Sequence, residues 1–291
     1  MTSPKISLVS YGNNLRRLPI LNGLDRAFKK LEVNSQDSPD YCITLDLPTY
    51  SEKSPTLIYY DTEGLYENLS EGSPDIIFTV EENAIKSLEQ FYNCPVFHLP
   101  LGVDLEVYKA IEVYQDIDII FCGTLFDPRP EVLSWLKPLS EEFKVQVITP
   151  ASWASRLKSF GNIEIISNNE WVSVKEVVNL YLRSKIILCI NRSKINRDGT
   201  ENKTIGRGFN ETALRRCTFI DNTRNITPYF VPGEEIVLYP VNDEGETLRS
   251  LLRYYLLNPS QRKSVAEKGF EHTYRNHTWE ERAKQILEVI N

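Results

Sequence analysis

The chain has 291 residues, of which 41% are hydrophobic and 25% charged, and its formal net charge is -7. Such a chain can fill the cores of two ordinary domains or of one large one. Its acidic balance, without a long basic stripe, argues against a dedicated nucleic-acid binder, and no apolar run approaches the roughly 20 residues that cross a bilayer.

The first 114 residues alternate short apolar runs with segments of helical period, the pattern of β-α units around a parallel sheet. Strands are predicted at 5–11, 40–45, 56–61, 75–80 and 95–101. A helix is predicted over 14–31, where Pro19 delays or kinks its start. A second helix is predicted over 81–93, with acidic residues in its first turn.

A second β-α series begins with the apolar run 116–123, and the polar segment before it suits a crossing between domains, so we place the boundary near Tyr114. Further strands are predicted at 144–149, 162–167, 185–191, 218–222 and 235–240, and helices at 129–143, 152–160 and 173–184. From Asp243 the chain is predicted to be helical almost to its end, with breaks at 258–259 and 276–278.

These elements predict an α/β fold with two doubly wound, Rossmann-like domains, residues 1–114 and 115–291. In open α/β sheets, ligands bind at the carboxyl ends of the strands. Residues that directly follow strands are therefore the candidates for function.

A basic segment follows the predicted strand 185–191. Between Asn191 and Arg216 the chain has seven basic and three acidic side chains, a local charge of +4. If a helix begins near Arg207, the flanking glycines let a ligand approach the backbone, and the free N–H groups favour an anion. Lys203 and Arg207 would add hydrogen bonds to phosphate. Glu211 would either accept hydrogen bonds from sugar hydroxyls or pair with Arg207 on a solvated helix start.

A second glycine ends the run 116–123. Gly123 is followed by Thr124 and, in the same loop, by Arg129, which could reach a phosphate. An ordinary β-α turn explains the same residues equally well.

Cysteine and histidine usage predicts reduced thiols and no metal. The five cysteines are odd in number, widely spaced and outside any C-x-x-C pair, so we expect buried thiols in a cytoplasmic protein. The N-terminus enters a strand-like run without the build of a secretory signal. The three histidines form no cluster with metal-ligand spacing.

Six segments, taken in order, resemble the catalytic domain of GT-B glycosyltransferases, in particular the CgeB-type (spore-maturation-like) group. They are FHLPLGVDLEVYKA, IDIIFCGTLFDPRPEVLSWL, YLRSKIILCINRS, RGFNETALRRCTFIDN, EEIVLYPVNDEGETLRSLLRYYLLNPSQRKSVAEKG and HTWEERAKQIL. The resemblance covers Asp75 to the C-terminus. It implies two Rossmann-like domains facing across a cleft, an acceptor side in the first and a donor site in the second, with the last helices packing back on the first domain.

The resemblance also implies the roles of the site residues. We expect a donor site formed by Gly123, Thr124, Arg129, Trp171, Val172, Lys203, Arg207 and Glu211. Glu211 would hold the ribose hydroxyls, the basic side chains and the Gly123 loop the diphosphate, and Trp171 and Val172 would lie near the nucleobase. Such enzymes stabilise the leaving diphosphate without a metal, so we expect no cofactor, only a UDP- or GDP-sugar as co-substrate.

Three departures leave retention or inversion of the sugar's configuration open. Lys203 stands eight positions before Glu211, where the retaining branch has a second glutamate. Arg216 replaces a small glycine, and Asn210 splits the usual F-E pair.

An inverting reaction needs a base for the acceptor proton, and a carboxylate after a first-domain strand would suit this role. Asp61, at the end of TLIYYD, is the best placed, and Asp46 is next. Each is also a natural strand-end residue. His98 is expected to pack inside its strand, and the 11–14 loop is either an acceptor loop or a plain turn.

The sequence thus predicts a metal-independent glycosyltransferase that moves a sugar from a nucleotide diphosphate donor to a hydroxyl of a glycan, small molecule or protein. Two alternatives stay open: a nucleotide-sugar epimerase on the same fold, and a non-catalytic nucleotide-sugar binding module. Glycosylation of nucleic acid ranks below them, because the first domain carries many acids.

Overall fold

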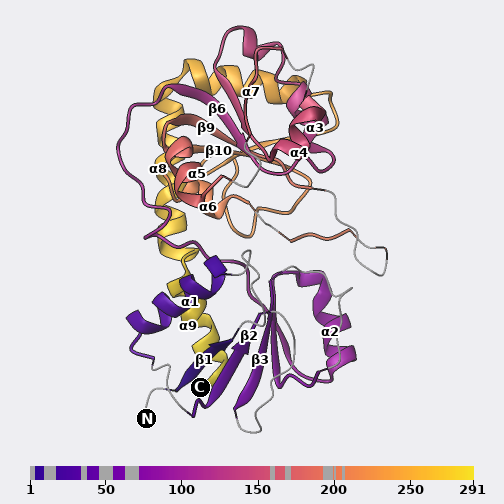
Figure 1. Ribbon diagram of the computed structural model, residues 1–291, viewed down its shortest axis with the longest axis vertical. Helices are drawn as coiled ribbons and strands as arrows, with labels where there is room; N and C mark the ends of the chain where they lie inside the picture. The colour runs from indigo at the N-terminus through magenta and orange to yellow at the C-terminus, as the bar shows by residue number, and fades with distance from the viewer. Residues whose placement is uncertain are drawn as a thin grey trace. The chain divides into compact units, whose positions relative to one another are not determined.

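The computed structural model describes residues 4–9, 18–33, 38–45, 55–62, 72–157, 161–167, 172–192, 199, 201–204 and 207–291. The chain divides into two compact units (Figure 1). The first unit comprises Met1–Val103, Lys194–Thr204 and His277–Asn291, and the second comprises Asp104–Ser193 and Ile205–Asn276. Among the described helices, none combines the length and apolar character needed to cross a bilayer.

The first unit is built on a parallel sheet of five strands in the order β1-β2-β3-β4-β5. The strands are β1 (Ile6–Val9), β2 (Tyr41–Thr44), β3 (Thr56–Asp61), β4 (Ile76–Thr79) and β5 (Val96–His98). Neighbours in this sheet follow one another along the chain, so the order of the described strands does not reverse. All five lie where the sequence predicts strands.

Helices cover both faces of the first sheet. Side chains alternate along a strand, so neighbouring apolar residues point to opposite faces and each face packs against helices. Phe78 packs in a buried cluster with residues of α1 (Leu18–Lys30) and α9 (Trp279–Ile290). Its neighbour Ile77 points to the opposite face and packs against α2 (Ile85–Tyr92). The first unit is therefore a three-layer α/β/α structure, with α1 and α9 side by side (Figure 1).

The second unit is built on a parallel sheet of six strands in the order β11-β10-β9-β6-β7-β8. Its strands are β6 (Ile117–Cys122), β7 (Val145–Ile148), β8 (Glu164–Ile166), β9 (Ser184–Cys189), β10 (Cys217–Asp221) and β11 (Val237–Tyr239). The chain lays β7 and β8 on one side of β6 and then returns to place β9 on the other side. The strand order thus reverses between β6 and β9, which is the point where such sheets bind ligands.

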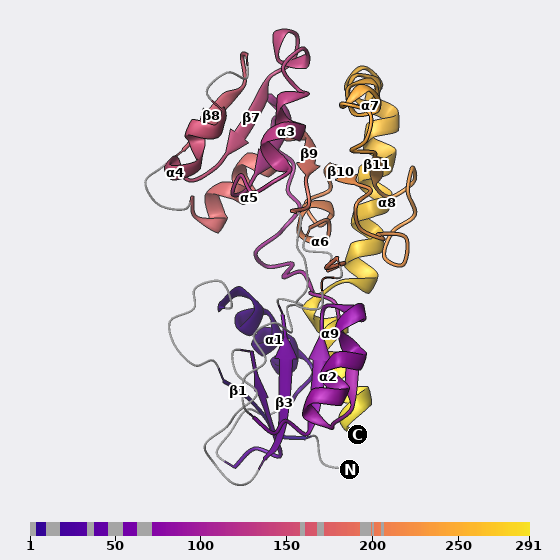
Figure 2. The same cartoon turned by 90° about the vertical axis from the view of Figure 1, so that its right-hand side faces the viewer.

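Helices also flank the second sheet, as Figure 2 shows. They are α3 (Arg129–Ser134), α4 (Ala151–Ala154), α5 (Val174–Leu182), α6 (Phe209–Thr212), α7 (Glu246–Leu257) and α8 (Pro259–Asn276). One large buried cluster joins the sheet to α3, α7 and α8. The breaks predicted between the last three helices are confirmed: α7 ends before Pro259, and α9 begins after Thr278, whose hydroxyl accepts a hydrogen bond from the Glu281 N–H.

Two predicted helices are shorter than their expected bounds, and a third, for which only the start is predicted, is a single turn. The predicted helix 129–143 ends at Ser134, and Pro138, which cannot continue a helix, follows. The predicted helix 152–160 is described only as α4 followed by a 3-10 turn, Ser155–Leu157. The helix expected near Arg207 is α6, a single turn, so its dipole contributes far less than a long helix would.

The last helix belongs to the first unit through a tight fit around Trp279. A Cβ built on Gly23 of α1 would lie 2.2 Å from Trp279 Cδ1, and one built on Gly102 would lie 2.8 Å from the Trp279 backbone N. Arg282, almost fully buried, donates from Nε to the Pro100 carbonyl at 2.8 Å. Glycine is therefore required at positions 23 and 102.

We predict that Gly23→Ala destabilises the protein although alanine favours helices. The new methyl group overlaps the indole ring, and such overpacking costs about 1–3 kcal/mol. Asn22→Ala, an exposed position of the same helix, is the matched control and should stabilise by up to about 0.7 kcal/mol. Urea unfolding measures both; a Gly23→Ala protein as stable as the control would contradict the close contact.

Candidate functional site

The backbone at the carboxyl end of β9 forms hydrogen bonds with side chains from four other parts of the second unit. The Tyr239 hydroxyl donates to the Cys189 carbonyl at 2.9 Å, and Arg129 Nε donates to the Ile190 carbonyl at 2.9 Å. One residue further, the Asn191 N–H donates to Asp221 Oδ2 at 2.5 Å.

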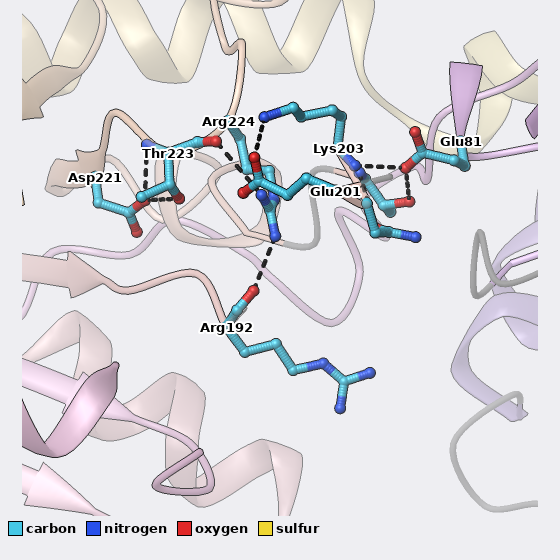
Figure 3. A network of polar contacts seen from close by, with 9 residues as sticks. Glu81, Arg192, Glu201, Lys203, Asp221, Thr223 and Arg224 are labelled. Carbon is cyan, nitrogen blue, oxygen red and sulfur yellow. Dashed lines mark hydrogen bonds and ion pairs between the residues drawn. The ribbon is translucent and has the colours of Figure 1, made fainter. Parts of the chain in front are cut away.

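Arg224 completes this frame by donating from its guanidinium to the Arg192 carbonyl at 2.9 Å (Figure 3). Asp221 also accepts hydrogen bonds from the N–H and the hydroxyl of Thr223, so the turn after β10 is tied to the same carboxylate. Tyr239, Arg129, Asp221 and Arg224 are all buried. The backbone of residues 189–192 therefore has one defined course at the edge where the strand order reverses.

Three arginines gather at this edge. The guanidinium carbons of Arg129 and Arg207 lie 5.8 and 5.3 Å from the centroid of the same ring, Phe121, and that of Arg192 lies 5.4 Å from the centroid of Phe126. Burial, followed by the charges of Arg207 and Arg192, lowers the pKa of Arg129 to about 9. The guanidinium stays protonated at neutral pH, but against the repulsion of its neighbours, and a bound anion would relieve that repulsion.

Arg129 also shapes the loop that follows β6. Its Nη1 donates to the Thr124 carbonyl at 2.8 Å, and the Thr124 hydroxyl lies 3.4 Å from the same nitrogen. A Cβ built on Gly123 would lie 2.5 Å from Arg207 Nη2, so only glycine leaves room for that guanidinium. Gly123, Thr124, Arg129 and Arg207 are therefore brought together.

Glu211 lies on α6 beside Arg207. Its Oε2 accepts a hydrogen bond from the Gly208 N–H at 2.8 Å, and its Oε1 lies 3.9 Å from Arg207 Nη1. The Glu211 carboxylate thus accepts the hydrogen bond from a backbone N–H that was expected to bind an anion. Among the described residues Oε1 has only the long contact to Arg207, so it is the oxygen that can accept a hydrogen bond from a ligand.

Two tyrosines that the sequence analysis does not select belong to the same region. Burial, and then the nearby Glu211 carboxylate, raises the pKa of Tyr108 above its ordinary value. Burial likewise raises the pKa of Tyr181, which hydrogen bonds with the Cys122 thiol. Tyr108 lies in the predicted linker and Tyr181 inside a helix, so neither directly follows a predicted strand, the feature by which candidates were chosen. Arg192 and Asn191 do carry that signal.

Of the other expected donor-site residues, the structure describes Val172 and Lys203. Val172 is half-buried in the loop between β8 and α5, and Trp171 lies outside the described residues. Lys203 belongs to the first unit, where its backbone N–H donates to Glu81 Oε2 at 2.8 Å (Figure 3). Its ammonium group pairs with Glu201.

The expected base, Asp61, lies in a buried network at the end of β3. It is 4% exposed, and its Oδ2 accepts a hydrogen bond from the Thr79 hydroxyl at 2.9 Å. The Thr79 oxygen in turn accepts from the Glu81 N–H at 3.1 Å, and the fully buried Glu81 carboxylate holds Lys203 and Thr204. Glu81 is also a carboxylate directly after a predicted strand of the first domain, so the reasoning that selected Asp61 applies to it as well.

His98 ends β5 and is partly buried, and burial lowers its pKa. Asp46, Gly206 and residues 11–14 lie outside the described residues. Asp116 and Asp118, at the start of β6, pair with Arg183 and Lys185. None of the five cysteines forms a disulfide. Within the described ranges, no group of three or more His, Cys, Asp or Glu is placed to hold a metal ion.

Comparison with known proteins places these features in a family. Residues 129–288, more than half of the chain, match the model of the glycosyl transferase-like family. None of the curated proteins matches the chain.

Solved structures share the fold at low sequence identity. AviGT4, a glycosyltransferase involved in avilamycin A biosynthesis, superposes with a TM-score of 0.67 at 11% identity, covering 98% of this chain and 96% of its own. HepE of Anabaena, in complex with UDP, gives 0.66 at 10% identity, covering 98% and 99%. Sucrose-phosphate synthase from Thermosynechococcus elongatus gives 0.60 at 11% identity, covering 96% and 79%.

These likenesses confirm the predicted fold class, an α/β fold of GT-B type with two Rossmann-like parallel sheets. The family match covers β7 to β11 and most of α9, and includes Arg129, Arg207 and Glu211. By that match the chain belongs to the glycosyl transferase-like family and is a glycosyltransferase.

Proposed function

We propose that this glycosyltransferase moves a sugar from a UDP- or GDP-sugar to an acceptor hydroxyl without a metal ion, with the donor bound in the second unit. The observation that carries the proposal is the cluster of Arg129, Arg192 and Arg207 at the carboxyl ends of β6 and β9. Solved structures of HepE hold UDP, UDP with glucose, and UDP-glucose, which supports a donor of this class.

The charges at the site suit a leaving nucleoside diphosphate. As the glycosidic bond to the diphosphate breaks, negative charge grows on its oxygens, and fixed cations stabilise that charge in the transition state. Arg207 presents a planar fork of donors, the geometry that binds phosphate oxygens in pairs. The Arg129 and Arg207 guanidinium groups would therefore supply the stabilisation that a metal supplies in other transferases.

Glu211 gives the site a polar contact of opposite sign. We propose that Oε1 accepts hydrogen bonds from the ribose hydroxyls while Oε2 stays on the Gly208 N–H. We further propose Lys203 as an additional phosphate contact, and Trp171 and Val172 as neighbours of the nucleobase. These three assignments rest on the resemblance of the chain as a whole, from Asp75 to its C-terminus, to the CgeB-type group, to which we assign the chain.

The first unit would then bind the acceptor, whose class is a glycan, a small molecule or a protein. For an inverting reaction we propose Asp61 as the base that removes the acceptor proton. Five cysteines outside disulfides fit a reducing compartment, and we place the enzyme in the cytoplasm.

Donor binding is the first test. We predict that one nucleotide sugar from a panel of UDP-, GDP-, dTDP- and ADP-sugars binds in calorimetry with equal affinity with and without magnesium. Glu211→Gln keeps the volume and an acceptor for Gly208 but loses the charge, so binding should weaken about tenfold, the worth of one charge-assisted hydrogen bond. Glu246→Ala, in the first turn of α7, is the control. A folded protein that binds no member of the panel would refute the donor proposal.

Arg129, which is buried, and Arg207, which is partly buried, are predicted to respond differently to lysine. Arg207→Lys loses the fork but breaks no hydrogen bond to the backbone of the described residues, so donor affinity should fall about tenfold with unchanged unfolding free energy. Arg129→Lys cannot keep its bonds to both the Ile190 and Thr124 carbonyls, so stability should also fall, by about 1–3 kcal/mol. Calorimetry and urea unfolding separate the two effects, with the exposed Arg253→Lys as control. Equal loss of stability in both variants would contradict the distinction.

Catalysis by Asp61 has a separate test. Asp61→Asn can still accept the Thr79 hydrogen bond, but it cannot remove a proton, so kcat should fall by roughly 100-fold or more while the donor Kd is unchanged. Asp40→Asn, an exposed acid that accepts the Lys5 N–H, is the matched control in the same sheet. Full turnover by Asp61→Asn would assign Asp61 a structural role, and donor binding without turnover under any acceptor would identify a binding module.

A further inference from the structure

Asn191 carries a buried amide without a partner at the edge of the second sheet. The residue is 8% exposed, and its Nδ2 forms no hydrogen bond with any residue that the structure describes. A buried polar atom without a partner costs free energy, so such atoms are rare unless a ligand or water completes them. This amide is therefore a cost to the ligand-free protein.

Hydrogen bonds to three buried side chains fix the backbone around Asn191. Its N–H is bound by Asp221, the preceding carbonyl by Arg129, and the following carbonyl by Arg224. Three buried side chains thus set the direction from which the Asn191 side chain leaves the backbone. The terminal amide can still turn about χ2, a broad torsion, to meet a bound group.

The surroundings select the chemistry of that group. Asn191 lies between Ile190, whose carbonyl accepts a hydrogen bond from Arg129, and Arg192. The carbonyl of Arg192 accepts a hydrogen bond from Arg224, and its side chain extends away from that carbonyl (Figure 3). Arg192 and Arg129 lie close enough for their charges to interact. A neutral N–H donor flanked by cations fits an anionic oxygen of a diphosphate better than a sugar carbon or a base edge.

We propose that Asn191 is a donor-binding residue whose side-chain amide donates a hydrogen bond to the diphosphate of the nucleotide sugar. This inference rests on the proposed function and adds to it a neutral contact that distinguishes a diphosphate from the nucleoside alone. It also explains why an unsatisfied amide persists at this edge of the sheet: the amide is paired only when the donor is bound.

The test compares Asn191→Ala and Asn191→Asp with the wild-type protein in calorimetry. The ligands are UDP and GDP, with uridine and guanosine as the matched ligands without phosphate. Asn179→Asp, exposed in the last turn of α5 before the start of β9, is the control for an added negative charge. Thermal unfolding of each ligand-free variant is measured in parallel.

We expect Asn191→Ala to weaken binding of the nucleoside diphosphate about tenfold and Asn191→Asp to weaken it further, because a carboxylate repels the phosphate. Nucleoside binding and the control should match wild type. The Tm of ligand-free Asn191→Ala should not fall, because the substitution removes an unsatisfied group, whereas a structural asparagine would lower it.

Wild-type affinity for the diphosphate in both variants would overturn the role of Asn191 while leaving the proposed function intact. A lowered Tm with equal loss of nucleoside and diphosphate binding would also overturn it, in favour of a structural role. A wild-type protein that binds neither UDP nor GDP would refute the proposed function itself, and this inference with it.

Discussion

The hydrogen bond from Arg129 Nε to the Ile190 carbonyl is the contact on which the candidate site depends. It joins the loop after β6 to the exit of β9, the two strands between which the chain reverses direction across the sheet. Any parallel sheet leaves backbone groups unsatisfied where its strands end, and here buried side chains satisfy them. Because these bonds take up Nε and Nη1 of Arg129, they also decide which guanidinium atoms face a ligand.

The same arrangement concentrates positive charge where burial makes charge costly. Arg129 and Arg207 share the ring of Phe121, and Gly123 is the residue that leaves space for Arg207. Placing cations together in a poorly solvated region reduces stability unless an anion joins them. If the site binds the donor as proposed, its cations are already in place and need not reorganise when the diphosphate leaves, which is how fixed charges lower a barrier.

The first unit shows how distant parts of one chain complete a domain. Trp279 fits against Gly23 and Gly102, so the last helix closes a core begun by the first strands. Glu81, fully buried, binds the backbone N–H of Lys203 and the hydroxyl of Thr204, two residues from the polar segment after β9. The chain thus passes between its units four times, at residues 103–104, 193–194, 204–205 and 276–277.

Sequence alone determined the features that depend on local pattern. The period of apolar residues placed all eleven strands that the structure describes and the three final helices. The order of the motifs indicated a glycosyltransferase, with Arg129, Arg207 and Glu211 as candidates. Helix lengths were wrong in places, as for the helix predicted over 129–143, which ends at Ser134.

Only the tertiary structure decided which of the candidates meet. Hydrogen bonds between residues far apart in the chain, such as Arg129 and Ile190 at 61 positions, leave no trace in either local sequence. Lys203 is the clearest example: by its position it belongs to a run of bases that includes Arg207, yet its backbone is bound by a carboxylate 122 residues away. The unpartnered amide of Asn191 is likewise invisible in the sequence, because whether a polar atom is satisfied depends on what the whole fold brings within reach.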